Sequence, residues 1–244
     1  MITDLPEQAY GLGTPSSEFR MDRSRLLLDA ASWLVIFAFF GLLHYWVGVG
    51  LIPLIFGAIP LGVSVAKFIK LFRNYDLRVI VFPENLSFTC SGRTMSFRWD
   101  DVSIIWEHIE IQRINFIPTR SIHQYTIETN QGEKIIFDRT LKGIDALGLI
   151  LKKKVGEHLI PKVVKSLKSG QTVQFGDLGL NNQVIKYKDK SLAWNELKEI
   201  RIWEGHISIH SMRKSLFPFA SLNYAVIPNA FIFIQLMKRF VNTG

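Results

Sequence analysis

The feature that most constrains this chain is an apolar run close to its N-terminus. Between Ala30 and Ala66, 37 residues include no Asp, Glu, Lys or Arg, and His44 is the one histidine among them. As one helix the run would be about 55 Å long, whereas the hydrocarbon core of a bilayer is about 30 Å thick. The sequence therefore predicts two membrane-spanning helices joined by a tight turn.

The two helices are expected at about residues 26–43 and 49–69, within a hairpin that covers residues 26–72. The break falls at residues 44–48, where a titratable ring, two aromatic residues typical of the membrane interface and a glycine coincide. A secretory signal peptide does not fit, because 25 residues of mixed charge precede the run. A buried hairpin in a soluble protein is a weaker alternative, since such segments rarely lack polar residues over this length.

Basic residues flank the hairpin on both sides, and none lies in its turn. They are Arg20, Arg23 and Arg25 before the hairpin, and Lys67, Lys70, Arg73 and Arg78 at its end. Because Lys and Arg are retained on the cytoplasmic side of a membrane, both termini are expected in the cytoplasm. This predicts a multi-pass protein of the inner (plasma) membrane. The single cysteine, Cys90, cannot form an intrachain disulfide and agrees with this location.

The rest of the chain contains an apparent repeat. Short alternating strands follow residue 74, a helical pattern with Pro161 inside it ends near Gly170, and the strands then begin again. Residues 96–102 align without a gap with residues 191–197 and match Trp99 to Trp194, so we expect these two tryptophans to be equivalent core anchors. The predicted division is a cytoplasmic N-terminal arm (1–25), the hairpin (26–72), a first strand-rich module (74–170) and a second (171–244).

A few strands closed by one C-terminal helix resemble the pleckstrin-homology-like (PH-like) fold. The predicted fold class is thus an α+β membrane protein with a two-helix transmembrane hairpin and two tandem PH-like modules. The chain as a whole resembles an uncharacterised bacterial membrane-protein family, DUF6585. The resemblance rests on YGLGTP, FRWDDVSIIWE, YTIETNQGEKIIF, LIPKVVKSLKSGQTVQFGDLGL, LAWNELKEIRIWEG and VIPNAFIFIQLM. It implies an architecture and no activity.

No pattern in the sequence predicts catalysis, a cofactor or a metal. His206 and His210 would share a strand face but lie about 13 Å apart, too far to ligate one ion. Neither phosphate-binding glycine motif occurs, and Cys90 has no charged neighbour in sequence before Arg93 that would activate it as a nucleophile. The adjacent pair Asp100 and Asp101 is better explained as a turn than as a catalytic dyad. We therefore expect a protein that is not an enzyme, with no catalytic, cofactor or metal site.

The chain carries a formal charge of +8, and part of it gathers on the predicted helix before Gly170. Lys162, Lys165 and Lys168 recur at three-residue steps and share one helix face. Nucleic acid is not an expected partner, because no nucleic-acid-binding motif accompanies these lysines. Anionic lipids are the nearer counter-charge for a membrane-bound chain, and an ordinary solvated face explains the pattern about equally well.

Two functions remain open at this stage. The first is a non-enzymatic, membrane-anchored interaction protein that presents two PH-like modules to a protein partner or to lipid headgroups. The alternative is an accessory subunit of a larger membrane complex, in which the hairpin packs against other spans through small residues. Those residues are Gly50, Gly57, Ala58 and Gly62.

Overall fold

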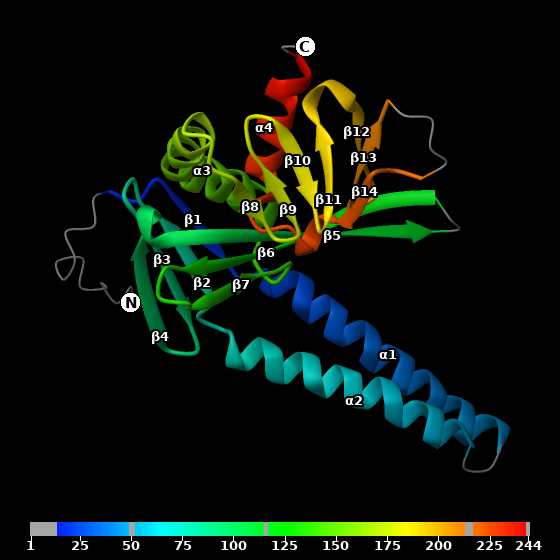
Figure 1. Cartoon of the computed structure of the whole chain (residues 1–244). Coiled ribbons are helices and arrows are strands. Elements are labelled where there is room, and N and C mark those ends of the chain that lie inside the picture. The colour runs from blue at the N-terminus through cyan, green and yellow to red at the C-terminus, as the bar shows by residue number, and fades with distance from the viewer. Residues whose placement is uncertain (1–13, 49–51, 115–116, 213–216, 243–244) are drawn as a thin grey trace. The chain divides into compact units, whose positions relative to one another are not determined.

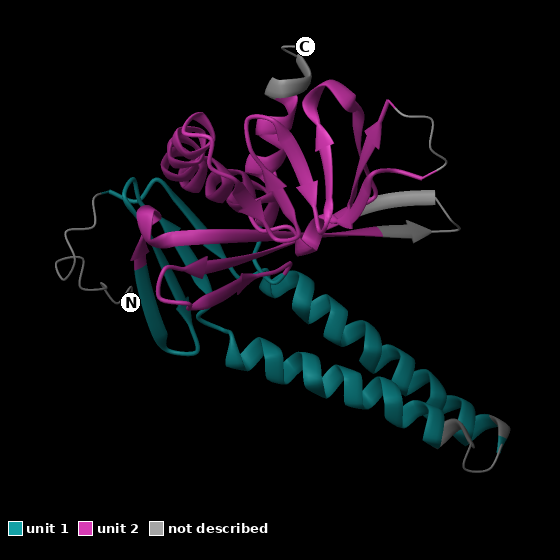
Figure 2. Ribbon diagram, in the orientation of Figure 1, with its two compact units in different colours: residues 1–96, 140–142 teal, residues 97–139, 143–244 magenta. Residues whose placement is uncertain are grey.

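The computed structural model describes residues 14–48, 52–114, 117–212 and 217–242 (Figure 1). Over these residues the fold is α+β, with four α-helices and four antiparallel sheets. The chain divides into two compact units (Figure 2). Unit 1 comprises residues 1–96 and 140–142, and unit 2 comprises residues 97–139 and 143–244.

Two long antiparallel helices, α1 (Arg23–Val47) and α2 (Ile52–Arg73), lie side by side in unit 1 (Figure 1). Both predicted helices are present: α1 extends beyond its expected range at both ends, whereas α2 begins three residues later and ends four residues later than expected. Both are long and apolar enough to cross a membrane. They approach closely at Ser64, whose hydroxyl donates to the Ala30 carbonyl at 3.0 Å. The turn between them, at residues 49–51, lies outside the described residues.

Unit 1 also contains a four-stranded antiparallel sheet in the order β1-β2-β3-β4. Its strands are β1 (Ser17–Arg20), β2 (Arg78–Val81), β3 (Asn85–Cys90) and β4 (Arg93–Arg98). The strand β1 pairs along its whole length with β2, from Ser17 opposite Val81 to Arg20 opposite Arg78. The expectation of an N-terminal arm missed this strand. The helical pair is therefore inserted between two adjacent strands of one sheet.

The first part of unit 2 is a three-stranded sheet followed by a helix. A 3₁₀ turn, η1 (Trp99–Asp101), leads into β5 (Val102–Ile114), β6 (Ile117–Thr129), β7 (Lys134–Phe137) and α3 (Ile144–Lys168). The pair Gln131 and Gly132 predicts a hairpin turn, and the turn does join β6 to β7; Gly132 has a φ of +82°, a conformation that favours glycine. Because proline removes one helical hydrogen bond, the sequence predicts two helical pieces or a kink at Pro161, but α3 is a single helix that runs through this residue.

The second part of unit 2 repeats the order of elements seen from the sheet of unit 1 through α3. A four-stranded sheet is followed by a 3₁₀ turn, a three-stranded sheet and a helix. The elements are β8 (Val173–Phe175), β9 (Leu178–Leu180), β10 (Val184–Tyr187), β11 (Lys190–Ala193), η2 (Trp194–Glu196), β12 (Leu197–Trp203), β13 (His206–Ser211), β14 (Ala220–Asn223), η3 (Tyr224–Val226) and α4 (Ala230–Asn242). The duplicated sequence key thus marks equivalent turns, η1 and η2.

One apolar core joins the elements of this second part. Alternation along β13 buries Ile207 and Ile209, which lie in the same cluster as Phe233 of α4. The helix α3 also contributes, because Leu167 belongs to this core and Leu159 packs against it. The sequence predicts that the apolar stripe through Leu151, Val155 and Leu159 packs on the first module. The structure shows that its C-terminal half packs on the second, so one helix serves both.

Candidate functional site

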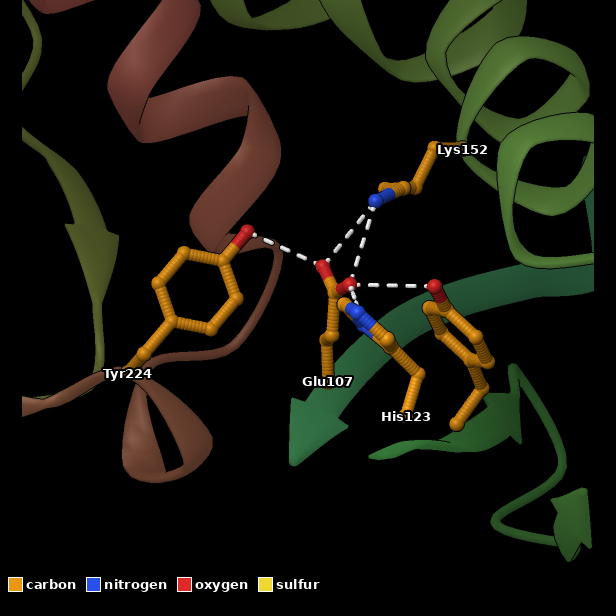
Figure 3. A network of polar contacts seen from close by, with 5 residues as sticks. Glu107, His123, Lys152 and Tyr224 are labelled. Atoms are coloured by element: carbon orange, nitrogen blue, oxygen red, sulfur yellow. Dashed lines mark hydrogen bonds and ion pairs between the residues drawn. The ribbon is translucent and has the colours of Figure 1, made fainter. Parts of the chain in front are cut away.

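The described part of unit 2 contains one buried carboxylate with an unusually complete set of partners (Figure 3). Glu107 Oε1 accepts a hydrogen bond from the Tyr125 hydroxyl at 3.0 Å and lies 2.9 Å from His123 Nδ1. Lys152 Nζ donates to both oxygens, at 3.2 and 3.1 Å. The Tyr224 hydroxyl donates to Oε2 at 3.1 Å. We call these five residues the Glu107 cluster.

Strand register and helix packing assemble this cluster. Glu107 on β5 lies directly opposite Tyr125 on β6, and His123 is two residues from Tyr125 on the same face of that strand. Lys152 comes from α3, which can approach because Gly148 has no side chain: a Cβ atom there would lie 2.0 Å from the Tyr125 ring. Tyr224 comes from η3, near the end of the second part of unit 2.

Electrostatics fix the protonation states in the cluster. Burial alone would raise the pKa of Glu107, but the hydrogen bond from His123 and the charge of Lys152 outweigh it and lower this pKa to about 2. Burial and the adjacent Glu107 carboxylate raise the pKa of Tyr125 and of Tyr224. At neutral pH the carboxylate is therefore ionised, and both phenols keep the protons that they donate to it.

The contacts of Glu107 hold several elements of unit 2 together. Glu107 is 5% exposed, and its two oxygens receive five contacts from four side chains. A general base needs a free lone pair within reach of a substrate proton, and these lone pairs are occupied. The carboxylate instead connects β5, β6, α3 and η3.

A second polar connection reinforces the same junction. Asn229, which has a φ of +53°, precedes α4 and binds the edge of β5 through three hydrogen bonds. Its side-chain oxygen accepts from Ile105 N at 2.9 Å, its side-chain amide donates to Ser103 O at 2.9 Å, and its backbone N–H donates to Ile105 O at 2.9 Å. Asn229 thus pairs with β5 much as a neighbouring strand would.

The sequence-predicted lysines lie where an external partner could reach them. Lys162, Lys165 and Lys168 are all exposed on α3. Within the described residues, none of the three has a hydrogen-bond or ion-pair partner. The structure therefore leaves this basic face available, and it does not bring other predicted site residues to it.

The two predicted repeat anchors differ in burial. Trp99 begins η1 and is 1% exposed, whereas Trp194 begins η2 and is only half-buried. Trp194 packs against the core of the second part, and its Nε1 donates to the Asn181 carbonyl at 3.0 Å. The positions are equivalent in the order of elements but not in environment.

Sequence reasoning did not find the Glu107 cluster. One signal was available: Glu107 occupies an inward-facing position of an alternating strand, between the inward residues Ile105 and Ile109. The partners of Glu107 come from three other elements, and no local sequence pattern predicts that they meet it. Among the described residues, no group of three His, Cys, Asp or Glu side chains is placed to hold a metal ion.

Comparison with known protein families identifies the family of this chain. It belongs to a protein family of unknown function, DUF6585, which matches residues 3–243 and so nearly the whole length. A comparison with curated proteins finds none that matches the sequence. The family therefore identifies relatives of the chain without assigning an activity to it.

Proposed function

We propose that the chain is a non-enzymatic interaction protein, anchored in the inner membrane by α1 and α2, with two PH-like modules at the cytoplasmic surface. The modules bind a protein partner or anionic lipid headgroups. One observation carries the proposal: the helical pair exposes apolar side chains along its length. Only 6% and 17% of the residues in its two most apolar windows are buried.

The exposed side chains on these helices are large. They include Leu28, Val35, Phe39, Leu42, Ile55, Phe56, Ile59 and Ile69. A core helix of a soluble protein would bury such a surface, and soluble proteins rarely expose apolar patches of this extent. A lipid environment supplies the missing burial, and the helical form satisfies the backbone hydrogen bonds there. Basic residues at the ends, Arg23 and Arg73 among them, suit the headgroup region.

The order of elements supports the PH-like assignment. Four strands, a 3₁₀ turn, three strands and a closing helix occur twice along the chain. In the first copy the helical pair occupies the connection between the first and second strands, β1 and β2. The helical pair is therefore inserted within the sheet of the first copy and does not precede it as a separate tether.

The Glu107 cluster supports a non-enzymatic role. The most strongly perturbed carboxylate described in the structure is occupied by donors from the chain itself. The exposed lysines of α3 support lipid binding, because each cation close to an anionic surface contributes about 1 kcal/mol.

Cysteine accessibility tests the anchoring and its orientation. In a Cys90→Ser background, single cysteines replace Tyr45, which is 83% exposed near the turn, or Tyr75, which is 61% exposed after α2. We expect a membrane-impermeant maleimide to label the first variant in intact spheroplasts and the second only after lysis. Labelling of Tyr75→Cys in intact spheroplasts would overturn the orientation, and release of the chain by alkaline carbonate would overturn the anchoring.

The alternative, an accessory subunit of a membrane complex, has one observation in its favour. A side chain at Gly62 would meet nothing within 4 Å, so this small exposed residue of α2 leaves room for a neighbouring helix. Gly57, in contrast, is used within the pair, because a Cβ there would lie 3.3 Å from Phe40. Gly50 lies outside the described residues. A stoichiometric partner that a Gly62→Leu variant loses during purification would favour this function.

A further inference from the structure

Unit 1 contains a cavity of about 630 Å³ where both helices join the sheet. We call it the foot pocket, and six of the residues that line it matter for its chemistry. They are Arg20, Asp22, Arg23, Asp76, Arg78 and Lys142. Four cations thus share one cavity with two carboxylates.

The fold brings these cations together from distant parts of the chain. Arg20 and Arg78 lie directly opposite each other in the β1–β2 pair, and Arg20 is already paired with Glu18 of its own strand, at 2.8 and 3.1 Å. Lys142 joins them because its backbone N–H donates to Arg20 O at 2.9 Å, and the neighbouring Met21–Leu141 bridge holds the same segment. Arg23 begins α1 and donates one hydrogen bond to the Tyr75 carbonyl at 2.7 Å.

The two carboxylates of the pocket are occupied by backbone donors. Asp22 caps α1 by accepting from Arg25 N at 3.1 Å. Asp76 accepts from Ser91 N at 2.8 Å and from Gly92 N at 2.5 Å, which holds the turn between β3 and β4. Within the described residues, neither the Arg78 guanidinium nor the Lys142 ammonium has an ion-pair or hydrogen-bond partner.

We propose that the foot pocket binds a phosphate ester, with Arg78 and Lys142 as its main contacts. A guanidinium offers a planar fork of donors that matches phosphate oxygens, and an ammonium adds a point charge. The inference rests on the proposed anchoring, which places the foot of the hairpin at the level of the lipid phosphates. A phospholipid headgroup and a soluble phosphate ester share this chemistry, and the test separates them.

The test uses the full-length chain in mild detergent and native mass spectrometry. The probes are phosphatidylglycerol, phosphatidic acid and phosphatidylcholine with identical acyl chains, and free glycerol phosphate. We expect one anionic lipid per chain to be retained in preference to phosphatidylcholine. Arg78→Gln with Lys142→Gln should weaken retention about tenfold or more, because charge-assisted hydrogen bonds are lost.

The matched control is Arg93→Gln with Lys186→Gln, which removes one arginine and one lysine that are exposed and outside the pocket. It should retain lipid as the unmodified chain does. Lys142→Gln alone serves if the double variant fails to fold, because the Lys142 side chain is exposed and only its backbone bonds to β1. It should also weaken retention.

The outcomes distinguish three questions: whether the foot pocket binds a phosphate ester, whether that ester is a lipid or a soluble molecule, and whether the chain is anchored in the membrane. Displacement of the lipid by free glycerol phosphate at a similar concentration supports the site and assigns it to a soluble ester. Equal retention of phosphatidylcholine and phosphatidylglycerol, or equal retention by the pocket variant and the control, overturns the proposal. Carbonate extraction of the same preparation reports separately on the anchoring, so a chain that stays in the membrane without a lipid preference contradicts only the pocket.

Discussion

The Glu107 cluster and the foot pocket are both rich in charge, but they differ in how completely that charge is paired. In the cluster one carboxylate receives five contacts and is 5% exposed. In the pocket the carboxylates bind backbone amides, and Arg78 and Lys142 line an open cavity without partners among the described residues. Charge that the chain pairs internally stabilises the fold, whereas charge left unpaired beside a cavity is available to a ligand.

The largest effect that tests this contrast is the loss of the buried carboxylate's charge. Glu107→Gln leaves Lys152 without its counter-charge inside unit 2, and breaking a buried pair typically costs about 3–5 kcal/mol. We expect a matching fall in the free energy of unfolding, followed by circular dichroism in detergent. Glu110→Gln, on the exposed side of the same strand, should change stability by less than about 0.5 kcal/mol. Equal effects from the two substitutions would contradict the structural role of the cluster.

Substitution of the two tryptophans tests whether the loss of stability in unit 2 depends on how deeply a side chain is buried. Trp99→Ala should destabilise the chain by about 3–5 kcal/mol, because the side chain is fully buried. Trp194→Ala removes a half-buried ring and one hydrogen bond, so about 1–2 kcal/mol is expected. The same unfolding measurement checks both values. Equal losses would mean that the repeated positions are equivalent in energy despite their different exposure.

Acid should remove the contribution of the Glu107 charge. The pKa of Glu107 is lowered from 4.5 to about 2 in the folded chain, so its stabilisation is complete above pH 4.5 and disappears as the pH falls through about 2. The shift corresponds to about 3 kcal/mol. The stability difference between the unmodified chain and Glu107→Gln should therefore shrink by about that amount between pH 5 and pH 2. A difference that stays constant with pH would contradict the assigned charge state.

The exposed lysines of α3 provide a third case, in which the charge is unpaired but, within the described residues, no cavity lies beside it. An environment-sensitive dye on Ser169→Cys, in a Cys90→Ser background, reports contact of this helix with the membrane in proteoliposomes. Replacement of Lys162, Lys165 and Lys168 by Gln should weaken contact with anionic vesicles by up to about 3 kcal/mol. Salt should weaken it too, because screening acts over about 10 Å at 0.1 M. No difference between anionic and neutral vesicles would leave these lysines as a solvated face.

The smallest expected effect is on the stability of the foot pocket variant. Arg78→Gln with Lys142→Gln removes cations that stabilise nothing within the described chain, so the free energy of unfolding should change by less than about 0.5 kcal/mol. A loss of 2 kcal/mol or more would show that the pocket, like the Glu107 cluster, is structural.

Local patterns in the sequence predicted most of the helices and strands. They could not predict contacts between residues that are distant in sequence. The apolar run predicted the helical pair, and alternation predicted strands such as β13 because its inward residues are apolar. The strand β1 has four residues, and its partner lies beyond the helical pair, so no local signal revealed it. A fragment that begins at residue 74 would therefore lack one strand of its first sheet. Lys142 and Glu107 acquire their roles only through pairing with residues far away in sequence.

The insertion of the helical pair between β1 and β2 has a consequence for how the protein is made. If α1 and α2 span a bilayer as proposed, these strands can pair only when both lie on the same side of it, which requires an even number of crossings between them. In a chain in which one of the two helices failed to insert, β1 (Ser17–Arg20) and β2 (Arg78–Val81) would lie on opposite sides of the membrane. Under the proposed anchoring, closure of this sheet therefore requires that both helices insert, and a chain in which one helix fails to insert would expose an unpaired strand edge.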